Sequence, residues 1–139
     1  MPALACMCAS LRRASRVLTQ HYDEVLRPLG LRATQFTVLQ ALSLVGEVSQ
    51  GKLGEILAMD STTLTRTLEI MCGHGWIVKR YGKDRRERRL RLSKAGEAQL
   101  NCALPSWQEV QERLRRRLGN RRWDNLMNLT NEVTSAVTE

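Results

Sequence analysis

Aromatic side chains are scarce in this sequence of 139 residues, which has only three Trp, two Tyr and one Phe. The core must therefore be built mainly from Leu, Val, Ile, Met and Ala, a composition that favours a mainly helical protein. Long apolar runs are missing too, since no stretch approaches the roughly 20 residues of a membrane-spanning helix. The apolar start precedes Arg12 and Arg13, whereas a secretory signal carries its charge before the apolar run. We therefore expect a cytoplasmic protein without a membrane partner.

Patterns typical of enzymes and metal sites are also missing. The chain has two histidines in unrelated contexts, no nucleophile–base pair with interpretable spacing and no glycine-rich phosphate loop. The four cysteines do not form a disulfide framework, and Cys6 and Cys8 on one helix would point their sulfur atoms in different directions. We expect Cys72 and Cys102 in the core. The sequence thus predicts no enzyme, no metal and no cofactor.

Basic residues outnumber acidic ones by 22 to 14, which gives a formal net charge of +8. Nine of the basic residues fall between Lys79 and Lys94, against only Asp84 and Glu87. Such a charge attracts phosphate backbones and acidic surfaces. A solvated basic face would carry a similar run, but this one lies inside a strand–turn–strand pattern rather than in a low-complexity tail.

Apolar residues at spacings of three and four predict a long first helix with a heptad-like seam. The seam runs from Leu4 to Leu29, and Pro28 and Gly30 end the helix. A helix this long in a small chain usually packs against something larger than its own domain. We therefore expect a dimer partner.

Three shorter helices are expected next, because Thr34, Ser49 and Asp60 are typical N-cap residues that precede apolar periodic segments. The last two of these helices are joined by a tight connection at Ala58 and Met59. Two short helices with such a connection are typical of a helix-turn-helix, whose second helix enters the major groove of DNA.

A basic hairpin follows. Strand-forming residues at 76–81 and 89–92 predict its two strands, and the polar turn between them should project from the body. Ser93 can cap a fifth helix that runs to about residue 118 with an irregularity at Pro105. A last helix follows Gly119.

At this point the sequence resembles the MarR family of winged-helix regulators over nearly its whole length. The matching segments, in chain order, are Gly30-Leu31-x-x-x-Gln35-Phe36-x-Val38-Leu39, Leu53-Gly54-Glu55-x-Leu57, Asp60-Ser61-Thr62-Thr63-Leu64-Thr65-Arg66, Gly75-Trp76-Ile77, Asp84-Arg85-Arg86-x-Arg88 and Leu92-Ser93-x-x-Gly96. The expected fold is mainly α with a small β-hairpin wing, in a single domain spanning residues 1–139. The resemblance implies a winged helix-turn-helix over residues 31–93 and a homodimer joined through residues 1–29 and 94–139.

The second helix of the helix-turn-helix is the expected recognition helix. Its outer face offers Ser61, Thr62, Thr65 and Arg66, and hydroxyls and an arginine near a helix start suit phosphate and base-edge contacts. Arg66 is the first candidate for base readout. Ser61 and Thr62 can equally serve as capping residues at the helix start.

The wing is expected to lay Arg85, Arg86 and Arg88 along the adjacent minor groove or backbone, where a narrow groove attracts arginine. Asp84 is better explained as an internal partner of Arg86 or Arg88 that shapes the tip.

Cys8 is a candidate redox sensor, because the stretch around it is similar to the one that carries the reactive cysteine in the family's organic-hydroperoxide sensors. Arg12, one turn further, would favour a thiolate. However, Arg12, Ala33 and Phe36 stand where those sensors have tyrosines, and Tyr22 lies at least two turns away. Cys8 also occupies a seam position, where cysteine often serves as a small core residue.

Many relatives bind a small aromatic ligand in a crevice between the dimer helices and the DNA-binding lobe. The residues near such a crevice are apolar, so core packing is their default interpretation; they are Leu11, Phe36, Leu39 and Trp107.

Together these features predict a dimeric, sequence-specific regulator of transcription that binds double-stranded DNA. The expected mode is repression at an inverted-repeat operator, with release by a small ligand or by thiol oxidation. The alternative is an architectural protein that binds nucleic acid without sequence preference.

Overall fold

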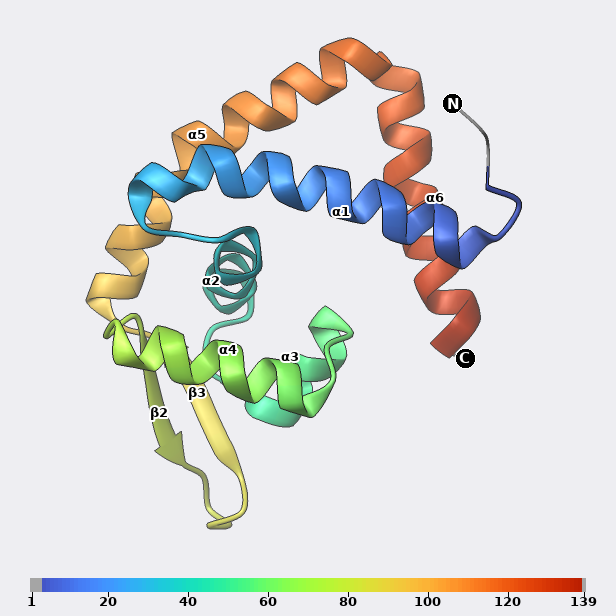
Figure 1. Cartoon of the computed structure of the whole chain (residues 1–139). Helices are drawn as coiled ribbons and strands as arrows, with labels where there is room; N and C mark the ends of the chain where they lie inside the picture. The colour runs from blue at the N-terminus through green and yellow to red at the C-terminus, as the bar shows by residue number, and fades with distance from the viewer. Residues whose placement is uncertain (1–3, 139) are drawn as a thin grey trace.

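The structure is a computed structural model that describes residues 4–138, and it is mainly helical with one small sheet (Figure 1). This confirms the fold class that the sequence predicts. Among residues 4–138, no helix is both long and apolar enough to cross a membrane. The elements in chain order are α1 (Met7–Leu26), the 3₁₀ turn η1 (Arg27–Leu29), α2 (Ala33–Val45), β1 (Val48–Ser49), α3 (Gln50–Leu57), α4 (Ser61–Gly73), β2 (Ile77–Tyr81), β3 (Arg88–Leu92), α5 (Lys94–Leu118) and α6 (Asn120–Thr138).

The first helix begins later than the seam predicts. Leu4 lies before α1, and Cys6 is the N-cap residue. At the other end, Pro28 lies in η1, and Gly30 takes the left-handed conformation, with a φ of 75°, that turns the chain into α2. The apolar seam is poorly covered by the rest of the chain: Leu11 and Leu18 each retain 39% of their exposure.

Local capping chemistry sets the start of three helices. The side chains of Ser49, Asp60 and Ser93 accept backbone N–H groups at the starts of α3, α4 and α5, as predicted. The prediction for Thr34 was wrong, because α2 begins at Ala33 and Thr34 lies inside it. The N-cap residue is Arg32, whose N–H is accepted by Gln35 Oε1 at 3.0 Å, and Asp23 Oδ1 of α1 accepts the Ala33 N–H at 2.6 Å.

The sheet has three antiparallel strands in the order β1-β3-β2, and β1 was not predicted. The hairpin register pairs Ile77 with Leu92 and Tyr81 with Arg88. Strand β1 joins the outer edge of β3, where Val48 pairs with Leu90. This short strand therefore connects the loop after α2 to the hairpin, which we call the wing (β2, residues 82–87 and β3).

The core lies between α2, α3, α4 and the sheet, which together form the unit that we call the lobe (residues 31–93). Its fully buried members include Leu39, Leu53, Leu68 and Leu90, and Leu26 joins them from α1. Two features attach the lobe to α5. The Phe36 and Trp107 rings lie 5.7 Å apart between centroids, and the start of α5 lies against the Trp76 carbonyl group.

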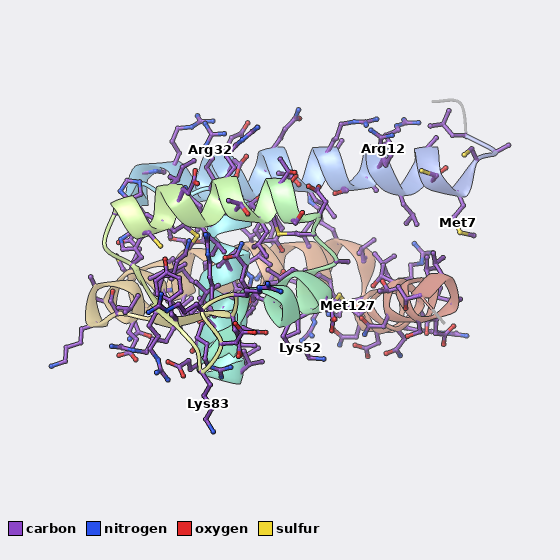
Figure 2. All side chains as sticks on the ribbon, turned by 90° about the horizontal axis from the view of Figure 1, so that it is seen from below. Met7, Arg12, Arg32, Lys52, Lys83 and Met127 are labelled. Atoms are coloured by element: carbon purple, nitrogen blue, oxygen red, sulfur yellow. The ribbon has the colours of Figure 1, made fainter. Side chains whose placement is uncertain are left out.

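The last two helices leave the lobe. Helix α5 is continuous through Pro105 and rises from the wing to the far end of the molecule, where α6 turns back (Figure 1). No residue described in α6 is buried. Seen from below, the ribbons of α1 and α6 lie apart (Figure 2). Exposed apolar side chains on both helices include Met7 at 66%, Val17 at 62%, Met127 at 48% and Leu129 at 54%.

Candidate nucleic-acid interface

Helix α4 lies beside the wing (Figure 1), and it has one apolar and one polar face. Its apolar residues, Leu64, Leu68 and Met71, point into the core. The opposite face brings together all four residues predicted for recognition, which line one shallow hollow with Glu69. These residues are Ser61, Thr62, Thr65 and Arg66.

The start of α4 is organised by Asp60. Its carboxylate accepts the Thr63 backbone N–H at 2.9 Å and the Thr63 hydroxyl at 2.7 Å. These two hydrogen bonds, the backbone one first, hold the pKa of Asp60 below its ordinary value. Asp60 therefore fills the capping role, and the exposed hydroxyls of Ser61 and Thr62 are left at the surface of the helix start.

Thr65 is half-buried and has a structural partner. Its Oγ1 accepts a hydrogen bond from Gln50 Nε2 at 3.1 Å, which ties the start of α3 to α4. The turn between the two helices passes through Ala58, which is left-handed with a φ of 51°. The two helices of the helix-turn-helix are thus fixed to each other through both the turn and a side-chain bond.

The tip of the wing is shaped by Asp84. Its Oδ1 accepts the backbone N–H of Arg86 at 3.0 Å, and its carbonyl accepts the Glu87 N–H at 2.9 Å. Asp84 is therefore an internal partner, as predicted, although it bonds the Arg86 backbone rather than a guanidinium group. The three wing arginines that were predicted to contact DNA are exposed around this tip, namely Arg85, Arg86 and Arg88. Lys83 also extends from the tip (Figure 2).

Two other wing arginines are held by Glu47, which follows α2. The Glu47 carboxylate accepts Arg80 Nε at 2.6 Å and Nη2 at 2.5 Å, and it accepts Arg89 Nε at 3.2 Å. Arg89 Nη1 also donates to Glu87 Oε1 at 2.8 Å. Arg80 and Arg89 belong to the basic run between Lys79 and Lys94, but both side chains fix the wing to the rest of the lobe. We call these four side chains the Glu47 clamp.

The clamp makes the stability of the lobe depend on pH. Hydrogen bonds from Arg80 lower the pKa of Glu47 from 4.5 to about 2, with Arg89 adding to the effect. Between these values the unfolded chain binds more protons than the folded one, so the contribution is complete above pH 4.5 and disappears as the pH falls toward 2. We expect Glu47→Gln to lower the urea midpoint at pH 7 and to lower it much less at pH 3.

The matched control for this prediction is Glu55→Gln, because Glu55 pairs with Lys52 at 3.3 Å on a well-exposed surface. Such pairs contribute little to stability. A deficit of Glu47→Gln that is equally large at pH 3 and pH 7 would contradict the assignment.

Cys8 lies exposed in the first turn of α1, with Arg12 one turn further along the helix. Tyr22 is 14 residues away, about 21 Å along a helix. Its hydroxyl bonds Gln111 on α5, and burial raises its pKa. Tyr22 is therefore engaged elsewhere.

The other two cysteines differ from each other. Cys72 packs against the core, as predicted, but Cys102 is exposed because it faces away from the buried positions of α5. Within residues 4–138, no group of three or more His, Cys, Asp or Glu side chains is arranged to hold a metal ion.

A cleft of about 890 Å³ separates the end of α1 and the start of α2 from one side of α4. Arg27 and Arg32 line it from one side, and Arg66, Thr67 and Ile70 line it from α4. Of the apolar residues considered for a ligand crevice, Phe36 and Leu39 are buried in the core, which agrees with their default interpretation. Trp107 packs against Phe36, and Leu11 is exposed.

Comparison with known proteins agrees with this geometry. Residues 31–87 match the family model described as the MarR family. An uncharacterized HTH-type transcriptional regulator, YwoH of Bacillus subtilis (strain 168), is 31% identical over 87 residues. That match covers 63% of this chain and 64% of YwoH, so it spans less than two thirds of that relative.

Solved structures resemble the whole described chain. The M. tuberculosis transcriptional regulator MosR in complex with DNA has a TM-score of 0.87 and 35% identity, and the match covers 96% of each chain. A mutant MarR from E. coli complexed with operator DNA has a TM-score of 0.76 and 25% identity, over 95% of this chain and 99% of that chain. These relatives are described as transcriptional regulators or bound to DNA.

Proposed function

The chain belongs to the MarR family, and from this premise we propose that it is a sequence-specific DNA-binding regulator of transcription. One observation carries the proposal. Helix α4, with its polar face, and the wing, with its arginine-bearing tip, lie beside each other in one lobe whose parts are fixed to each other by the Glu47 clamp and by the Gln50–Thr65 hydrogen bond. MosR and MarR, which share this fold, are described in complex with DNA.

In the proposed complex α4 enters the major groove. Arg66 reaches base edges there, because its planar guanidinium group can bond guanine with two donors. The hydroxyls of Ser61, Thr62 and Thr65 contact phosphates or bases near the helix start. The wing arginines lie along the neighbouring backbone or minor groove.

We propose that two chains act together as a homodimer. The exposed apolar residues of α1 and α6 support this, because a helix such as α6 with no buried residue gains little from its own chain. Two copies related by a two-fold axis would read an inverted repeat, with half-sites about one DNA turn apart. Sedimentation at micromolar concentration should give the mass of two chains, and a stable single chain would contradict the dimer.

Repression with release by a signal is the proposed mode of action. A small aromatic anion in the cleft beside α4 would meet Arg27, Arg32 and Arg66, and would favour one position of α4 over another. Oxidation of the exposed Cys8 on α1 is the alternative signal. Either signal can release DNA only if it favours the conformations that do not bind DNA over those that do.

The experiment that tests the function is a fluorescence-anisotropy titration. The protein is titrated against a duplex from upstream of its own gene and against a scrambled duplex, at several salt concentrations. A specific regulator should bind the first about a thousandfold more tightly. Equal affinity for both duplexes, and for sequences chosen by random selection, would favour the architectural alternative.

The contribution of the wing is tested by Arg86→Ala. Because Arg86 is exposed at the tip and its proposed contact is a phosphate, its loss should weaken binding to every sequence by a similar factor. The slope of log Kobs against log salt should flatten by about 0.9 for each lost phosphate contact. Lys94→Ala, at the start of α5, is the matched control, and an unchanged slope for Arg86→Ala would contradict the contact.

A further inference from the structure

A second concentration of arginine lies far from the wing, at the elbow where α5 ends and α6 begins. Between residues 113 and 122 the chain has six arginines and no acidic residue. Figure 1 places this elbow at the opposite end of the molecule from the wing tip. Helix α5 separates the two ends with 25 residues, about 37 Å of helix. DNA bound at the wing therefore does not account for these arginines.

Two of the six arginines have partners within the chain. Arg113 pairs with Glu109 at 3.3 Å, and the Arg115 guanidinium lies 5.3 Å from the centre of the Trp123 ring. The remaining four are exposed, and we call them the elbow arginines: Arg116, Arg117, Arg121 and Arg122.

Helix stability explains only half of the elbow arginines. Arg116 and Arg117 lie in the last turn of α5, where a cation interacts favourably with the helix dipole. Arg121 and Arg122 lie in the first turn of α6, which has no acidic residue. A cation there is unfavourable by a similar amount. Their position therefore lowers the stability of α6 and calls for another role.

We propose that the elbow arginines bind the phosphate backbone of a second DNA duplex, so that the protein can join two DNA segments. The chemistry fits, because a guanidinium group bonds phosphate through paired donors and carries its charge at any physiological pH. Phosphate contacts from arginine supply the sequence-independent part of DNA binding, and the elbow concentrates arginines with no acidic residue between positions 113 and 122. This second site goes beyond the proposed function, which concerns α4 and the wing.

The test is a two-duplex capture assay at low salt. The protein is saturated on an immobilised duplex, unbound protein is washed away, and a labelled duplex of unrelated sequence is added. Wild type should retain the labelled duplex. The elbow variant Arg116→Gln/Arg117→Gln/Arg121→Gln/Arg122→Gln should retain it at least about fivefold less, because each lost phosphate contact lowers salt-dependent affinity.

The reciprocal control is a wing variant, Arg85→Gln/Arg86→Gln/Arg88→Gln. This variant should bind the immobilised duplex poorly but keep weak, salt-sensitive binding to free duplex through the elbow. A variant that combines the wing and elbow substitutions should lose this weak binding. If wild type does not bind the immobilised duplex, that result contradicts the proposed function and not the elbow site. The elbow site is then tested by the titration of the wing variant with free duplex.

Three results would overturn the proposal. The first is equal retention of the labelled duplex by wild type and by the elbow variant. The second is retention of polyglutamate but not of duplex, which would assign the elbow to an acidic protein. The third is a change from paired to single chains in the elbow variant by light scattering, which would assign the arginines to contact between subunits.

Discussion

Gly96→Ala is expected to destabilise the folded chain by about 1–3 kcal/mol. A Cβ atom at this position would lie 2.1 Å from the Trp76 carbonyl oxygen and 3.0 Å from the carbonyl carbon. That carbonyl group cannot easily move, because it also accepts the Ser93 N–H at 3.0 Å where β3 joins α5. Alanine would favour the helix by up to about 1 kcal/mol, so the steric cost exceeds the gain.

The measurement is the urea midpoint of Gly96→Ala beside that of Gly51→Ala. Gly51 lies in α3 with open space around its Cα, so alanine there should be neutral or stabilising by up to about 1 kcal/mol. The same change of residue should therefore have opposite effects at the two positions. Equal midpoints for the two variants would show that the Trp76 backbone can give way.

Arg66→Ala should lower affinity for the specific duplex about 5- to 150-fold, which corresponds to about 1–3 kcal/mol for a lost base contact. Arg66 is exposed on α4, so the folded chain should keep its stability. The loss should be much smaller on a scrambled duplex, because base contacts add little there. Anisotropy titrations of both duplexes measure the difference.

Two further variants separate charge from geometry at this position. Arg66→Lys keeps the charge but not the planar pair of donors. It should therefore retain affinity for the scrambled duplex but lose the preference for the specific duplex. Arg16→Ala removes an exposed arginine from α1, away from α4, and should leave both affinities unchanged. Equal losses on specific and scrambled DNA for Arg66→Ala would mean that Arg66 contacts phosphate only.

The sequence predicted those features that depend on neighbouring residues. Ser49, Asp60 and Ser93 cap their helices through bonds to residues three positions ahead, so each cap is visible in a short window of sequence. Thr34 looked like the same signal. At the start of α2 the Ala33 N–H is instead accepted by Asp23, ten residues earlier on another helix, and only the packing of α1 against α2 brings that carboxylate there.

The number of basic residues predicted a basic wing, but it could not separate the arginines that bond Glu47 from those exposed at the tip. Strand β1 has two residues, too few for any periodicity, and it pairs with β3 about 40 residues later. Without that pairing, nothing in the sequence places Glu47 beside Arg80 and Arg89. The four residues of the recognition face were easier to predict, because a helical period with Leu64 and Leu68 inside leaves them outside.

The elbow arginines were not predicted as a binding site, for a different reason. Their charge is offset in the total by acidic residues at other places on α5 and α6, such as Glu109, Glu112 and Asp124. The basic run between Lys79 and Lys94 alone leaves +7 of the net +8, so the total suggests a single basic region. A sum over the chain contains no information on where opposite charges lie.

Because α5 is held at its start by the contact between Gly96 and Trp76, the long helix can act as a lever. At one end the Gly96 contact holds the helix against the Trp76 backbone just before β2, and at the other end α5 continues through the elbow into α6. Pro105 lacks the N–H that would bond the preceding turn, so the lever has one compliant joint along its length. We therefore expect a displacement applied between Gly96 and Pro105 to reach the lobe more directly than one applied at the elbow, part of which α5 can absorb by bending at Pro105.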